Sequence, residues 1–378
     1  MTHLKDLDPK VITELTDRDF TCRLVTDDQE DIVKALECIY SHYKFDYLHQ
    51  ALYDVDYFKE ILQGGRYVAA VAENRDGQVM GFGALDAHPW FDGLMEMGGL
   101  VVNPIARGLG LGDMLDDYRV EIGRTRGVRG LFATPVMPNP ASQKLLSRHG
   151  YIPTGMYFHA GGPESLGASG DGFHPMDCGF SVYIYDKETE HVLYAPDEIK
   201  DFVRDIFGEV GLKYRFAEAG AGCGAAACGT DGTAGAVANA GTDDSADTTS
   251  GTDDSAGTTA GTDLDLNHEV ASKLLEVRIR NISPDFREKI DALPYFEEGS
   301  DTQALMLLLC MNEPMCPECY EYLRSRGFIF SGLVPGGEQD LIVMQHLRHP
   351  IYRDYLHIEP DYERVLNLLY EVNGADME

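Results

Sequence analysis

The chain has 378 residues, of which 44% are hydrophobic and 25% charged, a composition typical of folded globular proteins with room for two domains. Its 63 acidic residues outnumber its 31 basic ones, and the net charge of −32 argues against nucleic acid as a partner, because phosphate binding needs clustered Lys and Arg. The opening residues, MTHLKDLDPK, lack the apolar core of a signal peptide, and the longest apolar run, at 304–311, is far shorter than the ~20 residues that span a bilayer. We therefore expect a cytoplasmic protein with no membrane partner, whose eight cysteines are reduced thiols.

Strand and helix patterns alternate through the first half of the chain. Asp27 and Asp28 are candidate N-caps for the first helix, and residues 74–77 (NRDG) are a hairpin turn signal between two apolar runs. The predicted strands cover 20–25, 66–73, 78–86, 94–104, 130–136, 154–160 and 179–186. The predicted helices run from about 28 to 40, from 110 to 126 and from 140 to 149. This order predicts an α/β fold built on a mixed sheet.

Residues 101–112, VVNPIARGLGLG, place three alternating glycines between a strand and a helix. Unpaired N–H groups at a helix N-terminus bind anions, and glycine lets a ligand approach the backbone. A dinucleotide-binding loop requires G-x-G-x-x-G, but Asp113 occupies the third glycine position, and a P-loop requires a G-K-[ST] that is missing here. The pattern that fits is R-x-x-G-x-G, at Arg107, Gly110 and Gly112, directly after an L-x-V-x-P strand end.

This pattern resembles the GCN5-related N-acetyltransferase (GNAT) family, and the resemblance covers about 20–185. A second motif supports it, because Asn139, Ser142, Leu145 and the pair Gly150-Tyr151 follow the N-x-x-[AS]-x-x-L…G-[FY] pattern of the family. The resemblance implies the GNAT acyl-CoA N-acyltransferase fold, with acetyl-CoA as co-substrate between the strand ending near Val102 and the next strand. The residues that it assigns to cofactor binding are Leu100, Val101, Val102, Arg107, Gly108, Leu109, Gly110, Leu111, Gly112, Asn139 and Ser142.

Transfer of an acetyl group to an amine needs a base, a stabilised oxyanion and a proton for the leaving thiolate. Glu96 lies where histone-type relatives carry a catalytic glutamate, and its apolar neighbours Met95 and Met97 suggest a raised pKa; the alternative is a surface acid. By the same resemblance, the backbone N–H of Val102 is the oxyanion donor. Leu146 stands where many relatives carry a tyrosine. We therefore name two tyrosines, Tyr151 and Tyr157, as catalytic candidates, with His149 or water as further possible proton sources.

The expected function is transfer of acetyl from acetyl-CoA to the amine of a small, cationic acceptor, by direct attack in a ternary complex. The acidic chain favours a cationic acceptor. Two alternatives stay open, a non-catalytic acyl-CoA sensor or scaffold and a protein N-acetyltransferase, and a homodimer is also possible. No metal is expected, because the lone C-x-x-C at Cys316 and Cys319 has no second pair.

We predict that an N-terminal GNAT domain covers residues 1–190, and the second half of the chain follows it. Residues 217–266 contain a repeated Gly/Thr/Asp-rich sequence and are predicted to be a disordered acidic linker. Residues 191–216 with 267–378 form the second unit, in which RSRGFIFSGL (324–333) aligns with SRHGYIPTGM (147–156). Because this unit has no R-x-x-G-x-G, we predict a degenerate GNAT-like copy that covers the acceptor site or mediates dimers.

Overall fold

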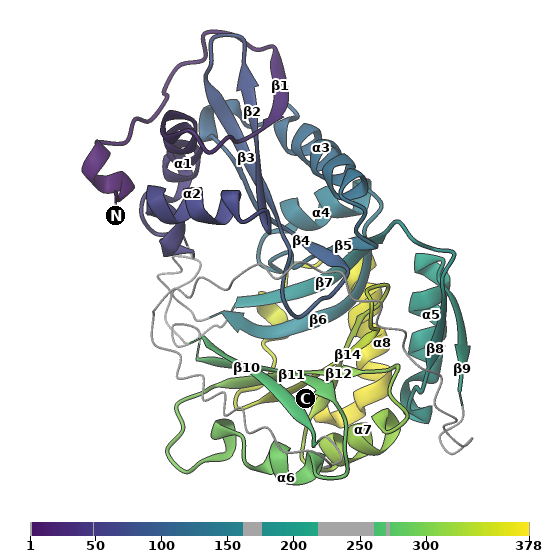
Figure 1. The fold of residues 1–378 in the computed structure, drawn as a ribbon. Helices are drawn as coiled ribbons and strands as arrows, with labels where there is room; N and C mark the ends of the chain where they lie inside the picture. Colours follow the sequence, from purple (N-terminus) through teal and green to yellow (C-terminus); the bar gives the residue numbers. More distant parts are fainter. Residues whose placement is uncertain (1, 48, 162–175, 218–260, 270–272, 378) are drawn as a thin grey trace, which may run out of the picture.

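A computed structural model describes residues 2–47, 49–161, 176–217, 261–269 and 273–377 (Figure 1). Among these residues, twelve strands form one mixed sheet in the order β1-β2-β3-β4-β5-β7-β6-β13-β14-β12-β11-β10, and β8 pairs with β9 separately. The strands of the first half are β1 (Phe20–Leu24), β2 (Tyr67–Asn74), β3 (Val79–Asp86), β4 (Leu94–Val102), β5 (Gly130–Ala133), β6 (Ile152–Gly161) and β7 (Met176–Ile184). Those that follow are β8 (Glu190–Leu193), β9 (Lys213–Phe216), β10 (Asp263–Glu269), β11 (Leu274–Asn281), β12 (Ala304–Cys310), β13 (Ile329–Val334) and β14 (Leu341–Leu347).

The helices of the described residues connect and cover these strands. They are α1 (Gln29–Tyr43), α2 (Val55–Gln63), α3 (Leu111–Thr125), α4 (Pro140–Arg148), α5 (Lys200–Val210), α6 (Phe286–Asp291), α7 (Cys316–Ser325) and α8 (Pro360–Asn373). No helix in the described part of the chain is long and apolar enough to cross a lipid bilayer.

The strands and helices predicted for the first half are present, with small differences at their ends. β5 is shorter than predicted, because it ends at Ala133 and not at 136. Pro135 cannot donate a ladder hydrogen bond, and its carbonyl accepts from Gly179 N of β7 at 2.9 Å. After Ala133, the backbone that follows β5 therefore stays beside β7 and no longer pairs with β4.

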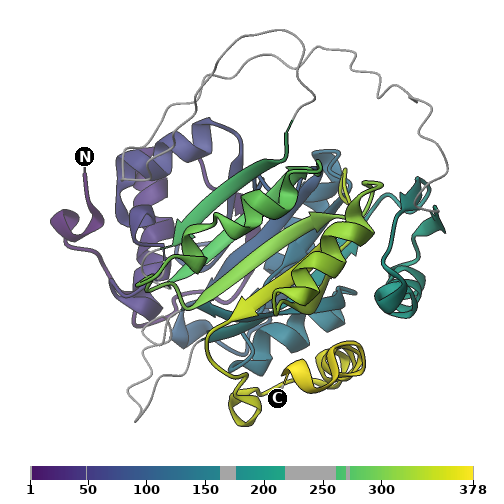
Figure 2. The ribbon, with the colours of Figure 1, turned by 90° about the horizontal axis from the view of Figure 1, so that it is seen from below.

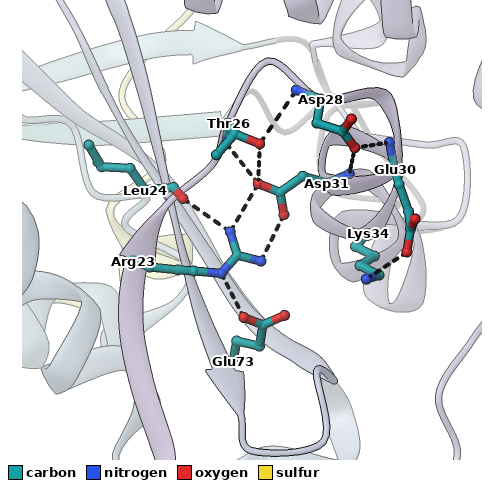
Figure 3. A network of polar contacts seen from close by, with 8 residues as sticks. All are labelled: Arg23, Leu24, Thr26, Asp28, Glu30, Asp31, Lys34 and Glu73. Carbon is teal, nitrogen blue, oxygen red and sulfur yellow. Dashed lines mark hydrogen bonds and ion pairs between the residues drawn. The ribbon is translucent and has the colours of Figure 1, made fainter.

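The start of α1 is fixed to the edge of the sheet by the charged network in Figure 3. Asp28 caps the helix by accepting hydrogen bonds from Glu30 N and Asp31 N, which confirms it as the N-cap. Arg23 of β1 pairs with Asp31 at 2.7 Å and with Glu73 of β2 at 2.6 Å. These contacts hold α1 over the sheet, where it packs with α2 on Phe82, Ala84 and Val101.

Most of the predicted linker, residues 218–260, lies outside the described residues, as do Cys223 and Cys228. Its C-terminal boundary needs correction, because β10 begins at Asp263, inside the range 217–266 predicted as linker. The strand forms because β11 offers an antiparallel partner, with Asp265 opposite Arg278 and Asn267 opposite Glu276. Leu264 packs against the main hydrophobic core at the same time.

The two halves of the sheet share one strand order, counted outward from the central pair β6 and β13. An antiparallel hairpin comes first (β6-β7 or β13-β14), then a parallel pair (β5-β4 or β12-β11), then one antiparallel strand (β3 or β10). Gly155 of β6 and Gly332 of β13, the residues that the sequence repeat aligns, face each other at the joint. The shared order is what a tandem arrangement requires.

Strand register places one set of side chains on a single side of this sheet, which we call the inner side. Paired residues share a side, and so do residues two apart along a strand. The path of such pairs runs through Asp86, Glu96, Phe132, Val182, Phe180, Gly155, Tyr157, Gly332, Val343, Leu308, Met306, Arg278 and Glu276. The sheet curls toward this side, so that β6 and β7 run above β10 and β11 (Figure 1 and Figure 2).

Candidate active site

The strands β4 and β5 pair over only three residues before they separate. Their parallel pairing runs from Leu94–Gly130 to Glu96–Phe132, and no described pair joins them beyond Glu96. β4 continues to Val102 beside β3, whereas the chain after β5 stays with β7 through the bridge between Val136 and Cys178. The backbone of β4 after Glu96 thus presents polar groups toward a gap in the hydrogen bonding between β4 and β5. Leu100, Val101 and Val102, which were predicted to bind the cofactor, lie in this part of β4.

A buried arginine that sequence reasoning missed holds the irregular part of β4. Arg119 of α3 is only 2% exposed and donates to Gly98 O at 2.8 Å and to Ala84 O at 3.2 Å, two residues that pair with each other next to a register shift between β3 and β4. It also pairs with Asp116. A Cβ at Gly83 would lie 2.9 Å from the Arg119 guanidinium, so that glycine makes room for it. The available signal was a cation within the apolar stripe of the helix predicted over 110–126.

The glycine loop connects the end of β4 to α3. Gly108 and Gly110 have φ values of +77° and +79°, a left-handed conformation that favours glycine. Gly110 is the N-cap of α3 and offers no side-chain cap, so the N–H groups of Leu111 and Gly112 precede the first helical hydrogen bond, from Met114 N to Gly110 O. The exposed loop residues Arg107 to Gly110 leave these donors accessible to an anion.

Gly112 differs from the other two glycines of the loop. Its φ is not positive, and a Cβ there would make only ordinary contacts, at 3.9 Å, with Leu100 and Leu145. The strand end, the glycine loop and α4 therefore meet around this residue.

Charged side chains surround the start of α3. Arg107 contacts His42 of α1 through Nη2 and Nδ1 at 2.9 Å. Arg148 donates to Asp113 at 2.8 Å, and this bond lowers the pKa of the Asp113 carboxyl. His149 lies 3.2 Å from the same carboxyl, so Asp113, at the third glycine position of the dinucleotide-binding pattern, forms an ion pair with Arg148 and also contacts His149.

The second predicted motif forms the N-terminus of α4. Asn139 is its N-cap and accepts a hydrogen bond from Ala141 N at 3.0 Å. Ser142 donates to Asn139 O at 3.2 Å. Both residues have local structural partners, and Asn139 is exposed.

Glu96 lies on the inner side at the last residue pair that joins β4 to β5. Thr134 donates to Glu96 Oε1 at 3.2 Å. Burial raises the pKa of Glu96 to about 7, with smaller contributions from the carboxylates of Asp86 and Glu276, while the Thr134 hydrogen bond acts in the opposite direction. This half-buried carboxyl therefore changes protonation near neutral pH, as a general base requires.

The two predicted tyrosines lie on opposite sides of the sheet. Tyr157 is on the inner side, stacks on Phe180 with ring centroids 5.4 Å apart, and donates its hydroxyl proton to Glu276 at 2.6 Å. Tyr151 is 2% exposed and packs with Leu131 and Leu146 on the side that carries Met95 and Met97. The structure thus brings Tyr157, but not Tyr151, to the side of Glu96.

The cysteine pair that the sequence singled out lies in the first turn of α7. Cys316 and Cys319 are buried, and burial raises the pKa of the Cys319 thiol to about 12. No group of three metal-ligating side chains is found within the described parts of the chain.

Comparison with known proteins assigns the part of the chain that contains these features. Residues 31–151 match the model of the acetyltransferase (GNAT) family. The chain carries a GNAT domain. The match includes the separated strands, Glu96, the glycine loop and α4, so the motifs that suggested the family lie within the GNAT segment.

Solved structures similar to this chain have low sequence identity to it. The protein yncA of Salmonella typhimurium, solved with its cofactor acetyl-CoA, is 24% identical and matches 47% of this chain and 98% of its own, with a TM-score of 0.38. An N-acetyltransferase from Staphylococcus aureus Mu50 is 19% identical over 44% of this chain and 99% of its own, with a TM-score of 0.37. No curated protein matches the chain.

Proposed function

We propose that this GNAT protein transfers acetyl from acetyl-CoA to the amine of a small, cationic acceptor, by direct attack in a ternary complex. The observation that carries the proposal is the separation of β4 from β5 immediately after Glu96, with the glycine loop at the end of the same strand. The free N–H groups at the start of α3 suit the pyrophosphate, and the gap in the ladder suits the extended pantetheine arm.

Glu96 is the base in this proposal. The amine nitrogen attacks the thioester carbonyl, a C–N bond forms, the C–S bond breaks, and the amine proton goes to the Glu96 carboxylate. The leaving sulfur takes up a proton, and Tyr157 is the predicted tyrosine on the correct side of the sheet to supply it. Tyr151 has no place in the proposed reaction, because its hydroxyl is buried on the other side.

The C-terminal half takes part as a covering unit. We propose that residues 191–216 and 263–378 are a degenerate copy of the GNAT fold that has kept the strand order and lacks the glycine loop. Its β11 faces β6 on the inner side, where the acceptor would bind.

The experiment is release of free CoA thiol from acetyl-CoA in the presence of a panel of small amines. We expect turnover by the native protein and a loss of about 10²-fold or more in kcat for Glu96→Gln, as is typical for removal of a general base. The matched control is Glu288→Gln, the same change at an exposed position on α6, which should keep the native rate. Binding of acetyl-CoA without thiol release on any amine would show a sensor or scaffold instead.

A further inference from the structure

A side-chain hydrogen bond crosses the point where β4 and β5 separate. Glu96 of β4 and Phe132 of β5 form the last described pair between the two strands, and β5 ends one residue later, at Ala133. Thr134, the first residue after β5, donates its hydroxyl proton to Glu96 Oε1 at 3.2 Å. The two strands are therefore joined by their backbones as far as Glu96 and by this side-chain contact directly after it.

The Thr134 hydroxyl and the Glu96 carboxyl meet on the inner side of the sheet, next to open space. Thr134 follows Phe132 by two residues, and Phe132 shares a side with Glu96. If the parallel pairing continued in register, Thr134 would lie opposite Gly98. A Cβ on Gly98 would meet no other described residue within 4 Å, and both Thr134 and Glu96 are half-buried. The bond thus lies where a ligand can reach the carboxyl.

The Thr134 hydroxyl is the contact that holds the Glu96 carboxyl. Among the described residues, no other side chain donates a hydrogen bond to Glu96, and no basic residue forms an ion pair with it. Oε1 is therefore engaged, and Oε2 remains available to a ligand. An ionised carboxyl group can only accept hydrogen bonds, so donation by Thr134 stabilises the ionised form. This bond accordingly lowers the pKa of Glu96 against the larger effect of burial.

We propose that Thr134 is a positioning residue for the base Glu96. Its hydroxyl holds Oε1, so that Oε2 is free to accept the amine proton, and it favours the ionised carboxyl that the reaction needs. The inference rests on the proposed function, in which Glu96 is the base. Thr134 acts through Glu96 and takes no part in making or breaking the C–N and C–S bonds.

The other titratable groups that influence Glu96 act against its ionisation or stay uncharged. Asp86, directly opposite on β3, and Glu276 of β11 both raise the pKa of Glu96 because they are acids. Three further groups interact electrostatically with Glu96, namely Tyr47, Tyr67 and Cys178. Burial raises the pKa of each of these three groups, so they stay uncharged between pH 5.5 and 9. Over that range, Thr134 is the contact that favours the Glu96 carboxylate.

The test is the pH dependence of kcat/KM in threonine variants. Thr134→Val removes the hydroxyl and keeps the shape of the side chain. We expect the rise in rate that follows ionisation of Glu96 to move up by about one pH unit, because the carboxylate loses its donor. At pH 9 this variant should still be slower than the native protein, because Oε1 is no longer held.

Two further variants separate the hydroxyl from the side chain and from its surroundings. Thr134→Ser keeps the hydroxyl and should restore the native pH profile. Thr189→Val is the matched control, because Thr189 also donates to a carboxylate, Asp186 Oδ2 at 2.7 Å, in an exposed turn between β7 and β8. This control should keep both the native rate and the native profile.

A measurement without substrate separates this inference from the proposed function. Titration of carbon-13-labelled glutamate carboxyl groups by NMR gives the pKa of Glu96 directly, and Glu96→Gln identifies its signal. An unchanged pKa in Thr134→Val, or a loss of rate that is equal at every pH, would overturn the role of Thr134 and leave acetyl transfer standing.

If the native protein acetylates no amine, the proposed function fails, and the NMR comparison still decides whether Thr134 controls the ionisation of Glu96. Thr134→Ala replaces Thr134→Val in both measurements if the valine variant does not fold, as judged by thermal unfolding.

Discussion

Glu96 is surrounded by groups that oppose its ionisation. It is half-buried beside Phe132, it lies opposite Asp86 on β3, and Glu276 acts on it from the C-terminal half. A carboxyl group in such surroundings keeps its proton to a higher pH than one in water. With a pKa of about 7, the Glu96 carboxylate that the proposed reaction needs is partly ionised at neutral pH and becomes fully ionised above it.

This environment predicts how kcat/KM depends on pH. The rate should rise with pH through about 7, because the pKa of Glu96 is raised to about 7 and only the ionised form accepts a proton. The acceptor amine has its own pKa near ~10, and its ionisation produces a second, separate pH dependence in the profile. Profiles between pH 5.5 and 9 should show the limb near 7 in the native protein and lack it in Glu96→Gln. A native profile that is flat across neutral pH would contradict the role of Glu96 as base.

The sequence identified Glu96 correctly as a residue with an unusual environment but for an incomplete reason. Met95 and Met97, the neighbours that suggested an apolar setting, point to the other side of β4 and pack with Tyr151. The raised pKa has other causes, burial on the inner side and two acids from distant segments. Which acids face one another depends on the curl of the sheet, and no local pattern contains that information.

At the scale of elements, the glycine loop combines two different uses of glycine. Gly108 and Gly110 allow a backbone conformation that other residues adopt only with strain. Gly112 is under neither conformational nor steric restriction from the protein, so its missing side chain leaves space at the start of α3. Only Gly112 can therefore be changed without strain in the loop.

We expect Gly112→Ala to separate ligand binding from stability. Alanine favours helix over glycine by roughly 0.5–1 kcal/mol, so thermal stability should be kept or should increase. Affinity for acetyl-CoA should fall, because the new methyl group lies beside the free N–H groups. Calorimetric titration of acetyl-CoA into the native and variant proteins measures this. Gly108→Ala is the comparison, and it should lose stability because of its φ of +77°. Unchanged affinity in Gly112→Ala would place the pyrophosphate elsewhere.

Most elements of the first half were predictable because turn and cap residues mark their ends. Asp28 begins α1, and Gly77 and Gly127 take the positive φ values that a turn and a helix end require. β10 was missed because its residues directly follow a low-complexity repeat and extend its composition. A strand of this kind is defined by its partner β11, a contact across the sheet that composition cannot show.

At the scale of the whole molecule, one pair of glycines joins the two halves of the sheet. The described pairing of β6 with β13 consists of Gly155 opposite Gly332. A Cβ on Gly155 would lie 2.7 Å from Ser331 O, and one on Gly332 would lie 2.6 Å from Thr154 O. The backbones approach so closely that any side chain at either position must push the halves apart.

Gly332→Ala should therefore destabilise the protein by about 2 kcal/mol or more, through overpacking and a φ of +131° that alanine does not favour. Urea unfolding measures the change in the free energy of unfolding. Gly208→Ala on α5, where a Cβ meets nothing within 4 Å, is the control and should keep or raise stability. A Gly332→Ala protein as stable as the native one would show that the joint tolerates separation.

The sequence repeat revealed that two similar units exist but not how they assemble. Aligning 147–156 with 324–333 places Gly155 against Gly332, yet it does not predict that these aligned residues touch. That contact, the curl of the sheet and the meeting of Tyr157 with Glu276 are long-range features of the assembled protein.

The position of α8 has a consequence for how the protein is made. This last helix packs on β6, and its Tyr362 reaches Ser181 and occupies the space above Gly179, both in β7. Gln143 of α4 likewise donates to His357 O at 3.0 Å. The first half of the chain emerges from the ribosome long before α8 is synthesised, so the surface of β6 and β7 stays uncovered during translation. Folding of the first half is thus completed by a helix that is synthesised much later, and the order of synthesis does not match the order of packing.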